Sequence, residues 1–566
     1  TEMAENGYWN RPSRRQVLRG GAVLGVGAVG AALIGCGSGG TGGSDAPKTG
    51  VVGTAVVATP DPNKPKRGGT FIFPSNSNLL GSTDLDPHTA PNTAVMQIWQ
   101  SISRGLMQID PQTNAPAPDF AKTVEQPDPL KINITIPDAK WDNKDPVNGR
   151  KVTAADVKYS LDRIRSTQPG FTRGSTISAL DKIDVVDDTH LTLTLKKPSV
   201  SFMYGLAFGL NVIVAPEVVT KFKDLKSPAS AIGMGPFAVE SFEPNVQVTL
   251  ARRADSWMGD RPWVDKVKYI NILDTAAGVA AYRAGQVHTM TVPPDQVDQF
   301  KRDLKNHTFQ TRGGISRGSF TLRMDGKVPW GTDVRVRQAL SLAVDRQEAI
   351  EVVYSGRGKP VATIPWVFEG FAIPQDQLGG LLGYKKDKNA ERAEATKLLQ
   401  AAGQEKLSFE ILSSSTNPTP HMAAAQLVQD NLKKIGVTVK LDLIEFTSYK
   451  KRVDDGNWVA TTDGFSSGFN PDEHLRQYAY TKGSRNYGGY SNKEYDALVD
   501  KADAEFDPKK RGEIMQQAQK ITINEVSHVW LGCGEGVAVS QPSVKNYIPT
   551  GEFPQTWRWD QLWLEA

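Results

Sequence analysis

The segment 407–443 constrains the fold most, because its apolar pattern changes from a two-residue period to a helical stretch and back again. Apolar and polar residues alternate over 407–411 and again over 437–443, while 421–435 is helical and Gly436 ends that helix. Two strands joined by one helix lie parallel through a right-handed crossover. This part of the chain is therefore predicted to form an α/β unit.

Strand and helix patterns also follow one another along the rest of the chain. Thr153 is expected to cap a helix, with Asp156 three residues on. A further helix is expected to run from Asp333 towards Ile350, and another over 390–402. No fixed-period repeat occurs, which disfavours a solenoid or a propeller. Alternation predicts strands at 70–73, 132–136, 191–195 and 246–250.

The N-terminal segment has the pattern of an export signal. Arg14 and Arg15 precede an uncharged stretch over 20–34 that is too short for a membrane-spanning helix, which needs about 20 residues. The arginine pair resembles the twin-arginine export signal, although Val17 stands where that signal usually has Phe. Residues 1–36 are therefore predicted to be a twin-arginine-type lipoprotein signal peptide, and export by the general secretory route stays open.

Cys36 ends this segment in the sequence Leu-Ile-Gly-Cys, which resembles the bacterial lipobox. Acylation would hold the protein at the membrane surface, since each buried CH₂ group contributes about 0.8 kcal/mol. The alternative is that Cys36 is an incidental small residue. Residues 37–66, rich in Gly, Ser, Thr, Ala and Pro, are expected to form a disordered tether. We thus expect an extracytoplasmic protein, in the periplasm or at the cell surface, that is anchored by lipid at Cys36.

Charge and cysteine content argue against two kinds of site. The formal net charge is +4 and residues 1–35 carry +2 of it, so the body lacks the basic field that nucleic-acid binding requires. Cys533 is the only other cysteine, so the mature chain has no second thiol for an internal disulfide. It lies in an apolar stretch and is expected to be a small buried residue rather than a nucleophile.

Several segments, in order along the chain, match motifs of one protein family. They are Arg-Gly-Gly-Thr at 67–70, Asp-Leu-Asp-Pro-His at 84–88, 148–161, 233–237 and, most specific, Asp-Val-Arg-Val-Arg-Gln-Ala-Leu-Ser-Leu-Ala-Val-Asp-Arg at 333–346. Such an ordered set over hundreds of residues is hard to obtain by chance. From about 67 to about 548 the chain thus resembles the bacterial extracellular solute-binding proteins of family 5, the dipeptide, oligopeptide and nickel type.

This resemblance implies an α/β fold of the periplasmic-binding-protein type II, with two lobes joined by two crossing strands and the ligand between them. It places lobe I at 67–316 and 530–566, with an extra subdomain at about 105–240, and lobe II at 317–529. It also implies the substrate-binding component of an ABC importer, which captures a small solute, with a peptide or peptide-like compound as first candidate. The solute would pass to a membrane permease and its ATPase subunits. We expect a monomer that needs no cofactor and catalyses no reaction.

The expected ligand-binding segment departs from the family pattern at one position. Peptide-binding members pair the free amine with an Asp in a segment like Gly-Trp-Gly-Ala-Asp-Tyr-Pro-Asp-Pro, whereas 464–472 is one residue shorter here and has Gly468 in that place. A buried ammonium without a carboxylate costs several kcal/mol, which argues against the usual clamp. Asp463 or Asp472 would restore it, unless these acids are turn-capping or surface residues.

Six residues are predicted to contact the ligand, by analogy with the cleft-lining loops of the family. Aromatic residues suit an apolar pocket wall, and core packing is the alternative for each of them. The predicted set is His88, Trp366, Phe465, Ser466, Phe469 and Asp472.

Other functions stay open at this point. A sugar, a metal chelate or a haem-like cargo would suit the same fold, and a ligand sensor would share its closing motion. The seven histidines form no ligand-spaced pair, so no metal site is predicted. Asp84 and Asp86 lack the later ligands of a calcium loop and are interpreted as turn residues. An extracytoplasmic hydrolase is the rival class, and we expect no serine-hydrolase elbow, phosphate loop or zinc-protease motif to support it.

Overall fold

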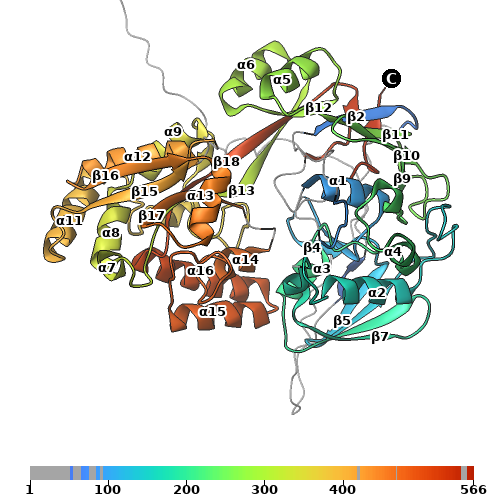
Figure 1. Cartoon of the computed structure of the whole chain (residues 1–566), viewed down its shortest axis with the longest axis horizontal. Helices are drawn as coiled ribbons and strands as arrows, with labels where there is room; N and C mark the ends of the chain where they lie inside the picture. Colours follow the sequence, from blue (N-terminus) through green and yellow to red (C-terminus); the bar gives the residue numbers. More distant parts are fainter. Residues whose placement is uncertain are drawn as a thin grey trace, which may run out of the picture. The chain divides into compact units, whose positions relative to one another are not determined.

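Two long antiparallel strands, β13 (Thr308–Leu322) and β18 (Val529–Ser540), run side by side through the fold (Figure 1). Their register pairs Thr308 with Ser540 at one end and Phe320 with Val529 at the other. The lobe boundaries predicted at 316 and 529 fall on these two strands. The computed structural model describes residues 51–54, 65–75, 84–89, 93–111, 113–171, 173–416, 421–466, 468, 470–549 and 558–565.

Both long strands belong to a seven-stranded sheet of the described residues, in the order β12-β18-β13-β17-β15-β16, with β14 also paired to β18. β15 and β16 are parallel and are joined by α12 (Ala423–Lys433), so the predicted β-α-β unit is confirmed. β17 runs antiparallel to β13 and parallel to β15. The strands span Thr289–Val292 (β12), Gly358–Lys359 (β14), Ser408–Ser414 (β15), Thr438–Ile444 (β16) and Ala460–Ser466 (β17).

The helix expected from Asp333 towards Ile350 is two helices, α8 (Val334–Ala343) and α9 (Arg346–Tyr354). The break lies at Asp345, whose side chain accepts hydrogen bonds from the N–H groups of Gln347 at 3.0 Å and Glu348 at 3.1 Å. An aspartate at this position caps a new helix better than it continues the old one. The prediction of a single helix was therefore wrong, although both helices cover the sheet.

Two further sheets lie in the N-terminal half of the chain. One has the order β2-β11-β10-β9, with β2 parallel to β11, and the other has the order β1-β5-β6-β8-β7. The four strands predicted by alternation are confirmed as β2, β6, β8 and β10. The bounds are Val51–Thr54 (β1), Thr70–Ser75 (β2), Thr123–Asp128 (β5), Lys131–Thr135 (β6), Leu180–Val185 (β7), His190–Leu195 (β8), Phe237–Glu243 (β9), Gln247–Arg252 (β10) and Lys266–Asn271 (β11).

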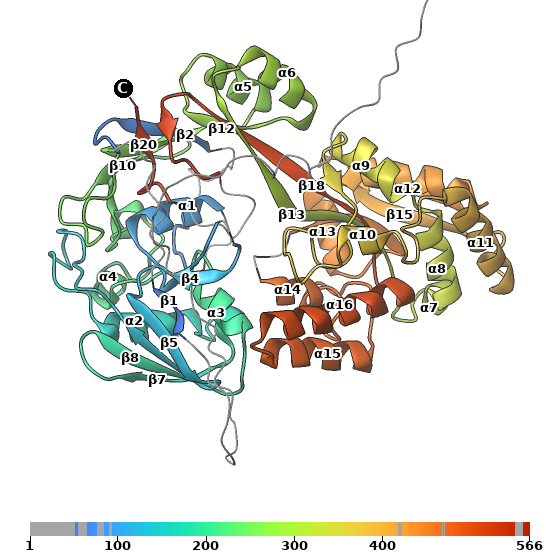
Figure 2. The same ribbon diagram turned by 180° about the vertical axis from the view of Figure 1, so that it is seen from behind.

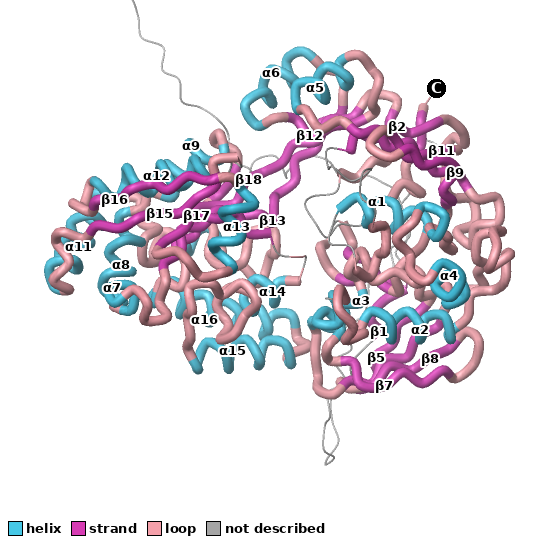
Figure 3. The backbone as a smooth tube through the Cα atoms, viewed as in Figure 1, coloured by secondary structure: helices cyan, strands magenta, loops and turns pink. Residues whose placement is uncertain are grey.

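The helix predicted after Thr153 is α2 (Ala154–Ile164). Asp156 accepts a hydrogen bond from the Thr153 N–H at 2.9 Å, as expected for the start of this helix. Val157 and Leu161 are buried and Ile164 joins them on one face, which covers the five-stranded sheet (Figure 3). The apolar period of α2 therefore places it against the strands.

Among the remaining elements, α15 packs alongside α16 (Figure 2). None of the described helices combines the length and the apolar character that a membrane crossing requires. The helices are Thr93–Ile102 (α1), Ser201–Leu206 (α3), Pro216–Phe222 (α4), Thr275–Arg283 (α5), Val297–Asp303 (α6), Pro329–Thr332 (α7), Gln375–Leu378 (α10), Lys388–Ala401 (α11), Phe446–Asp454 (α13), Pro471–Arg476 (α14), Lys493–Ala504 (α15) and Pro508–Glu525 (α16); the 3₁₀ turns are Arg173–Ile177 (η1), Pro228–Ser230 (η2) and Pro294–Gln296 (η3); the short strands are Met107–Ile109 (β3), Pro116–Pro118 (β4), Val544–Lys545 (β19) and Trp563–Leu564 (β20).

The predicted signal peptide, Cys36 and most of the predicted tether lie outside the described residues. Within the range predicted as tether, β1 pairs antiparallel with β5 and matches Val51 with Glu125.

A buried cluster of charges ties the C-terminal segment to the N-terminal half. The Asp560 carboxylate is fully buried and accepts ion pairs from Arg104 at 2.6 Å, Arg261 at 3.1 Å and Arg558 at 3.2 Å. These three positive charges hold the pKa of Asp560 far below its ordinary value, against the opposing effect of burial. Segments more than 450 positions apart in the sequence are thus joined through one carboxylate.

We expect Asp560→Asn to lower the free energy of unfolding by about 3–5 kcal/mol, because it leaves buried arginine charges without their anion. Urea denaturation at neutral pH measures this. Asp265→Asn is the matched control, since Asp265 is half exposed and pairs with Arg252 at 3.0 Å, and it should cost less than about 1 kcal/mol. Equal losses in the two variants would contradict the structural role of Asp560.

Candidate functional site

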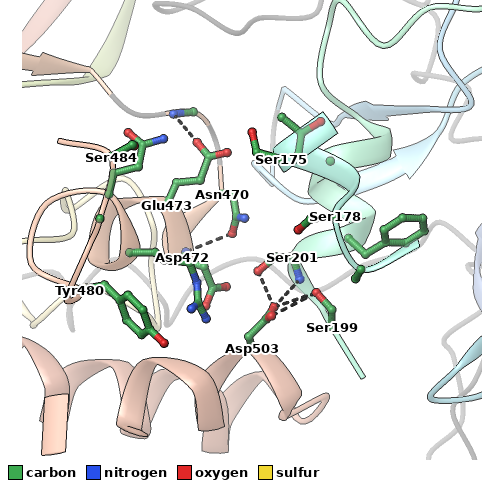
Figure 4. Close-up of a pocket in the computed structure, with 18 of the residues that line it drawn as sticks. Ser175, Ser178, Ser199, Ser201, Asn470, Asp472, Glu473, Tyr480, Ser484 and Asp503 are labelled. Carbon is green, nitrogen blue, oxygen red and sulfur yellow. Dashed lines mark hydrogen bonds between the residues drawn. The ribbon is translucent and has the colours of Figure 1, made fainter. Parts of the chain in front are cut away.

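A cavity of about 520 Å³ opens between two segments that lie far apart in the sequence (Figure 4). One wall comes from η1, α3 and the residues around them, and the other from α14, the segment 476–485 and the end of α15. Hydroxyl groups of Ser175, Ser178 and Ser484 and the carboxyl groups of Asp472 and Glu473 lie along these walls. The cavity therefore presents hydrogen-bonding groups and charges of both signs to a solute, because Lys197, Arg476, Lys482 and Arg485 line it as well.

The sequence Asn470-Pro471 places the acids of this wall. The Asn470 side chain accepts a hydrogen bond from the Asp472 N–H at 3.0 Å, and Pro471 occupies the first position of α14. Asn as the cap and Pro at the first turn are both favoured at a helix start. Asp472 and Glu473 consequently lie in the first turn of α14, next to the pocket.

Glu473 is the functional candidate that the sequence analysis missed. Its Oε2 accepts a hydrogen bond from the Gly468 N–H at 3.1 Å, and Oε1 accepts none from the described residues. Burial raises the pKa of Glu473 above its ordinary value and the nearby Asp472 adds to this, while Gly468 and Arg485 oppose it. The Asn-Pro helix start predicts an acid in the first turn at this position, but no local sequence feature shows that this acid faces a cavity.

Asp472, a predicted site residue, does line the cavity. It is almost fully buried, its Oδ2 accepts an ion pair from Arg511, and its Oδ1 has no hydrogen-bond partner among the described residues. Burial raises the pKa of Asp472, and Arg511 opposes that effect. The arginine compensates this carboxylate from behind the pocket wall.

The other predicted site residues lie elsewhere. His88 is fully buried in the N-terminal half, where its Nε2 donates to the Val212 carbonyl at 3.0 Å, and it is not among the residues that line the cavity. Trp366 lies against Gly313, with the Lys359 ammonium 4.3 Å from its ring centre, also away from the cavity. Phe465 and Ser466 are described only as backbone of β17, and Phe469 lies outside the described residues.

Asp463, considered as a substitute amine anchor, occupies a different site. It lies on β17 with Oδ1 3.6 Å from the His421 Nε2, and it accepts a hydrogen bond from the Gly464 N–H at 2.7 Å. Burial raises the pKa of Asp463 to about 6, against the opposing effects of Gly464, Lys450, Arg485 and Tyr449. Asp463 does not line the cavity.

Residues 464–468 have the Gly-x-Ser-x-Gly spacing of serine hydrolases. In those enzymes the serine occupies a sharp turn between a strand and a helix, whereas Ser466 pairs with Ser316 as the last residue of β17. The spacing alone therefore does not indicate a nucleophile here. No group of three or more His, Cys, Asp or Glu side chains in the described ranges is arranged to hold a metal ion.

Asp503 joins the two walls at one edge of the cavity through direct hydrogen bonds. Asp503, at the end of α15, accepts hydrogen bonds from the Ser201 N–H at 3.0 Å and from the Ser199 hydroxyl at 3.1 Å. The Val200 N–H donates to the Asp503 carbonyl at 2.8 Å. Since α3 has no side-chain cap of its own, Asp503 supplies the cap of this helix from a segment 300 positions away.

Comparison with known proteins identifies the class. A model of the family described as bacterial extracellular solute-binding proteins, family 5 Middle, matches residues 115–487. The chain belongs to this family of solute-binding proteins.

Individual relatives are distant but cover most of the chain. Dipeptide-binding protein DppE of Bacillus subtilis is 25% identical over 518 residues, which are 87% of this chain and 92% of that protein. Heme-binding protein A of Haemophilus influenzae is 24% identical over 428 residues, 70% of this chain and 75% of that protein. The solved periplasmic binding protein DppA from Helicobacter pylori, in complex with the peptide STSA, superposes with a TM-score of 0.71 at 22% identity and covers 88% of this chain and 99% of its own. The chain therefore has the two-lobed α/β fold of periplasmic binding proteins.

We expect Asp503→Ala to accelerate amide hydrogen exchange in 199–206 by at least about tenfold, because each lost bond to a charged group contributes about 1.5–3 kcal/mol. Exchange detected by mass spectrometry measures this. Asp500→Ala is the control. Asp500 lies on α15, like Asp503, and its carboxylate pairs with Arg476 at 2.9 Å. Its removal should leave exchange in 199–206 unchanged. Identical rates in Asp503→Ala and the unmodified protein would contradict the capping contact.

The raised pKa of Asp463 predicts a specific pH dependence of stability. Between pH 4 and pH 6 the folded protein binds more protons at this carboxyl than the unfolded chain does, so the free energy of unfolding falls as pH rises through this window. The contribution is at most about 3 kcal/mol, the equivalent of roughly two pKa units. Urea denaturation from pH 4 to pH 7 should show a smaller slope in Asp463→Asn than in the unmodified protein and the same slope in the exposed control Asp455→Asn. Asp472 and Glu473, whose pKa values are also raised, account for the slope that remains. Equal slopes in Asp463→Asn and the unmodified protein would assign the effect to another group.

Proposed function

We propose that this protein is the substrate-binding component of an ABC importer and that its cavity takes a peptide or peptide-like solute by the free amino group. The observation that carries the proposal is Glu473, a cavity-lining carboxylate with one oxygen left free by the described residues. Its position beside Gly468 puts a negative charge next to the residue that replaces the family's aspartate. Glu473 thus takes the role that the sequence analysis considered for Asp463 or Asp472.

The chemistry of this carboxylate favours an ammonium group. The Glu473 carboxylate is partly desolvated and has a single N–H donor, so an ammonium with three donors would both bond its free oxygen and stabilise its charge. Asp472 and Asp503 add negative charge on the same wall, although Arg511 and the start of α3 compensate them. Lys197, Arg476, Lys482 and Arg485 bring positive charge to the same cavity. Glu473 has no ion-pair partner among the described residues, so it is the acid best placed to pair with a solute cation.

The rest of the cavity suits a compact polar solute. Its volume of about 520 Å³ falls within the usual range of roughly 300–1,000 Å³ for small-molecule sites. Serine hydroxyls at 175, 178 and 484 both donate and accept hydrogen bonds, as the N–H and C=O groups of a peptide require. Phe202 and Phe208 supply apolar surface for side chains.

A non-peptide cargo is the second candidate, because a relative of similar identity is named a heme-binding protein. Charge and hydrogen bonding at Glu473 favour the amine, and direct binding measurements distinguish the two. We further propose that the protein is exported and held at the membrane by lipid at Cys36, acts as a monomer and delivers its solute to a permease driven by ATPase subunits. No reaction on the solute is needed for this role.

We expect the unmodified protein to bind tri-alanine about 10–100-fold more tightly than N-acetyl-tri-alanine, since a hydrogen bond to a charged group contributes about 1.5–3 kcal/mol. In Glu473→Gln this preference should shrink to within about threefold. Isothermal titration calorimetry at pH 7 measures both. Affinity for tri-alanine should also fall as pH is lowered through the raised pKa of Glu473, because the protonated carboxyl loses its charge.

Glu494→Gln is the matched control, since Glu494 is exposed on α15 and away from the cavity. It should keep the full preference for the free amine. A preference that survives in Glu473→Gln would place the amine elsewhere. Binding of haem in an absorbance titration, together with no binding of tri-alanine, would favour the non-peptide candidate.

A further inference from the structure

Strand β13 carries a buried arginine with no carboxylate partner among the described residues. The Arg317 side chain is fully buried, and its guanidinium carbon lies 4.2 Å from the ring centre of Trp530 and 4.8 Å from that of Tyr478. Its Nε and Nη2 have no hydrogen-bond partner among the residues that the structure describes. A buried charge is normally paired, so this arrangement calls for a physical reason beyond packing.

The bond that Arg317 does make fixes the proton of a neighbouring histidine. Its Nη1 donates to the Nδ1 of His474 on α14. A guanidinium has donors only, so Nδ1 must carry a lone pair and the single ring proton of a neutral His474 lies on Nε2. That Nε2 donates to the Gly468 carbonyl at 3.1 Å.

Gly468 is consequently held from both sides. Its carbonyl accepts from His474, and its N–H donates to Glu473 at 3.1 Å. Gly468 and Glu473 line the cavity, whereas Arg317 does not. A continuous series of hydrogen bonds therefore runs from β13 to the carboxylate proposed to accept the amine.

Electrostatics keep this series in one protonation state. Burial lowers the pKa of Arg317 only to about 10, so it stays charged at neutral pH. Burial and this charge together hold the pKa of His474 well below its ordinary value. The pKa of His528, which also faces Arg317, is lowered to about 3 for the same two reasons. The other titratable groups that act on the pair are Tyr478, Cys533, Tyr495 and Arg485 around Arg317, with Asp472 and Glu473 beside His474 on α14.

We propose that Arg317 is a positioning residue for solute binding, which excludes a proton from His474 Nδ1 and thereby holds Gly468 and Glu473 in place. This role rests on the proposed function, since the group that Arg317 is proposed to hold in place is the Glu473 carboxylate. Arg317 itself touches no solute. Removing its charge allows His474 to take up a second proton, which puts one positive charge on the ring that holds the Gly468 carbonyl and lets this segment reorganise.

Nitrogen chemical shifts of ¹⁵N-labelled histidine test this in the ligand-free protein, with His474→Gln for assignment among the seven histidines. In the unmodified protein His474 should show a protonated Nε2 and an unprotonated Nδ1 that stay constant from pH 5 to pH 8. In Arg317→Met it should titrate within this range. Affinity for tri-alanine should then become pH-dependent between pH 5 and pH 7 by roughly tenfold more than in the unmodified protein. Arg317→Lys, which keeps a charged donor, should restore the constant shifts.

Arg346→Met is the control for loss of a buried arginine. Arg346 is also buried, lies 4.2 Å from the ring centre of Tyr384 and bonds backbone carbonyls away from the cavity. It should lower stability without changing His474. A His474 that titrates near pH 6.5 in the unmodified protein, or carries its proton on Nδ1, overturns the proposal even if no variant folds. Constant shifts in a folded Arg317→Met protein overturn it as well. Failure of every variant to bind tri-alanine, with the expected shifts, counts against the proposed function alone.

Discussion

The antiparallel pairing of β13 with β18 is the constraint on which the rest of the structure depends. Its hydrogen bonds set two segments more than 200 residues apart in one register, with Gly318 opposite Gly532. That register brings Arg317 onto the ring of Trp530 and so sets the position of His474. A Cβ at Gly313 on the same strand would collide with the ring of Trp366, so close approach requires glycine there.

Some buried charges in this protein are paired with an opposite charge, and others are not. Asp560 is surrounded by three arginines, and Asp472 is paired with Arg511, so each anion is compensated within the fold. Arg317 instead depends on aromatic rings and a neutral histidine, and the free oxygen of Glu473 has no donor among the described residues. Since uncompensated polar groups are costly, they are retained where binding or positioning gives them a role. Glu473 lies on the cavity wall, and Arg317 is joined to it through His474 and Gly468.

The candidate site was only partly predictable. The departure from the family pattern at Gly468 was visible in the sequence, and both Gly468 and Asp472 line the cavity. Analogy also selected His88, but that side chain is a buried core residue whose Nε2 bonds to the Val212 carbonyl. Glu473 was missed because nothing in its neighbourhood distinguishes a solvated acid in the first turn of a helix from one that faces a pocket. The residues near 175 and 199 that line the cavity with it are far away in the chain.

By itself, the sequence determined the local elements and the class of fold. Periodicity predicted the β-α-β unit and four further strands, Thr153 marked the start of α2, and the ordered motifs indicated the solute-binding family, because each depends on neighbours a few positions away. The prediction of a single helix beyond Asp333 was wrong, because the Asp345 side chain caps a second helix there despite the continuous apolar pattern. Only the tertiary structure decided which acid faces the cavity, which arginine lacks an anion and which carboxylate caps α3. Those outcomes follow from packing between segments that are hundreds of residues apart, and local sequence patterns carry no information about such pairings.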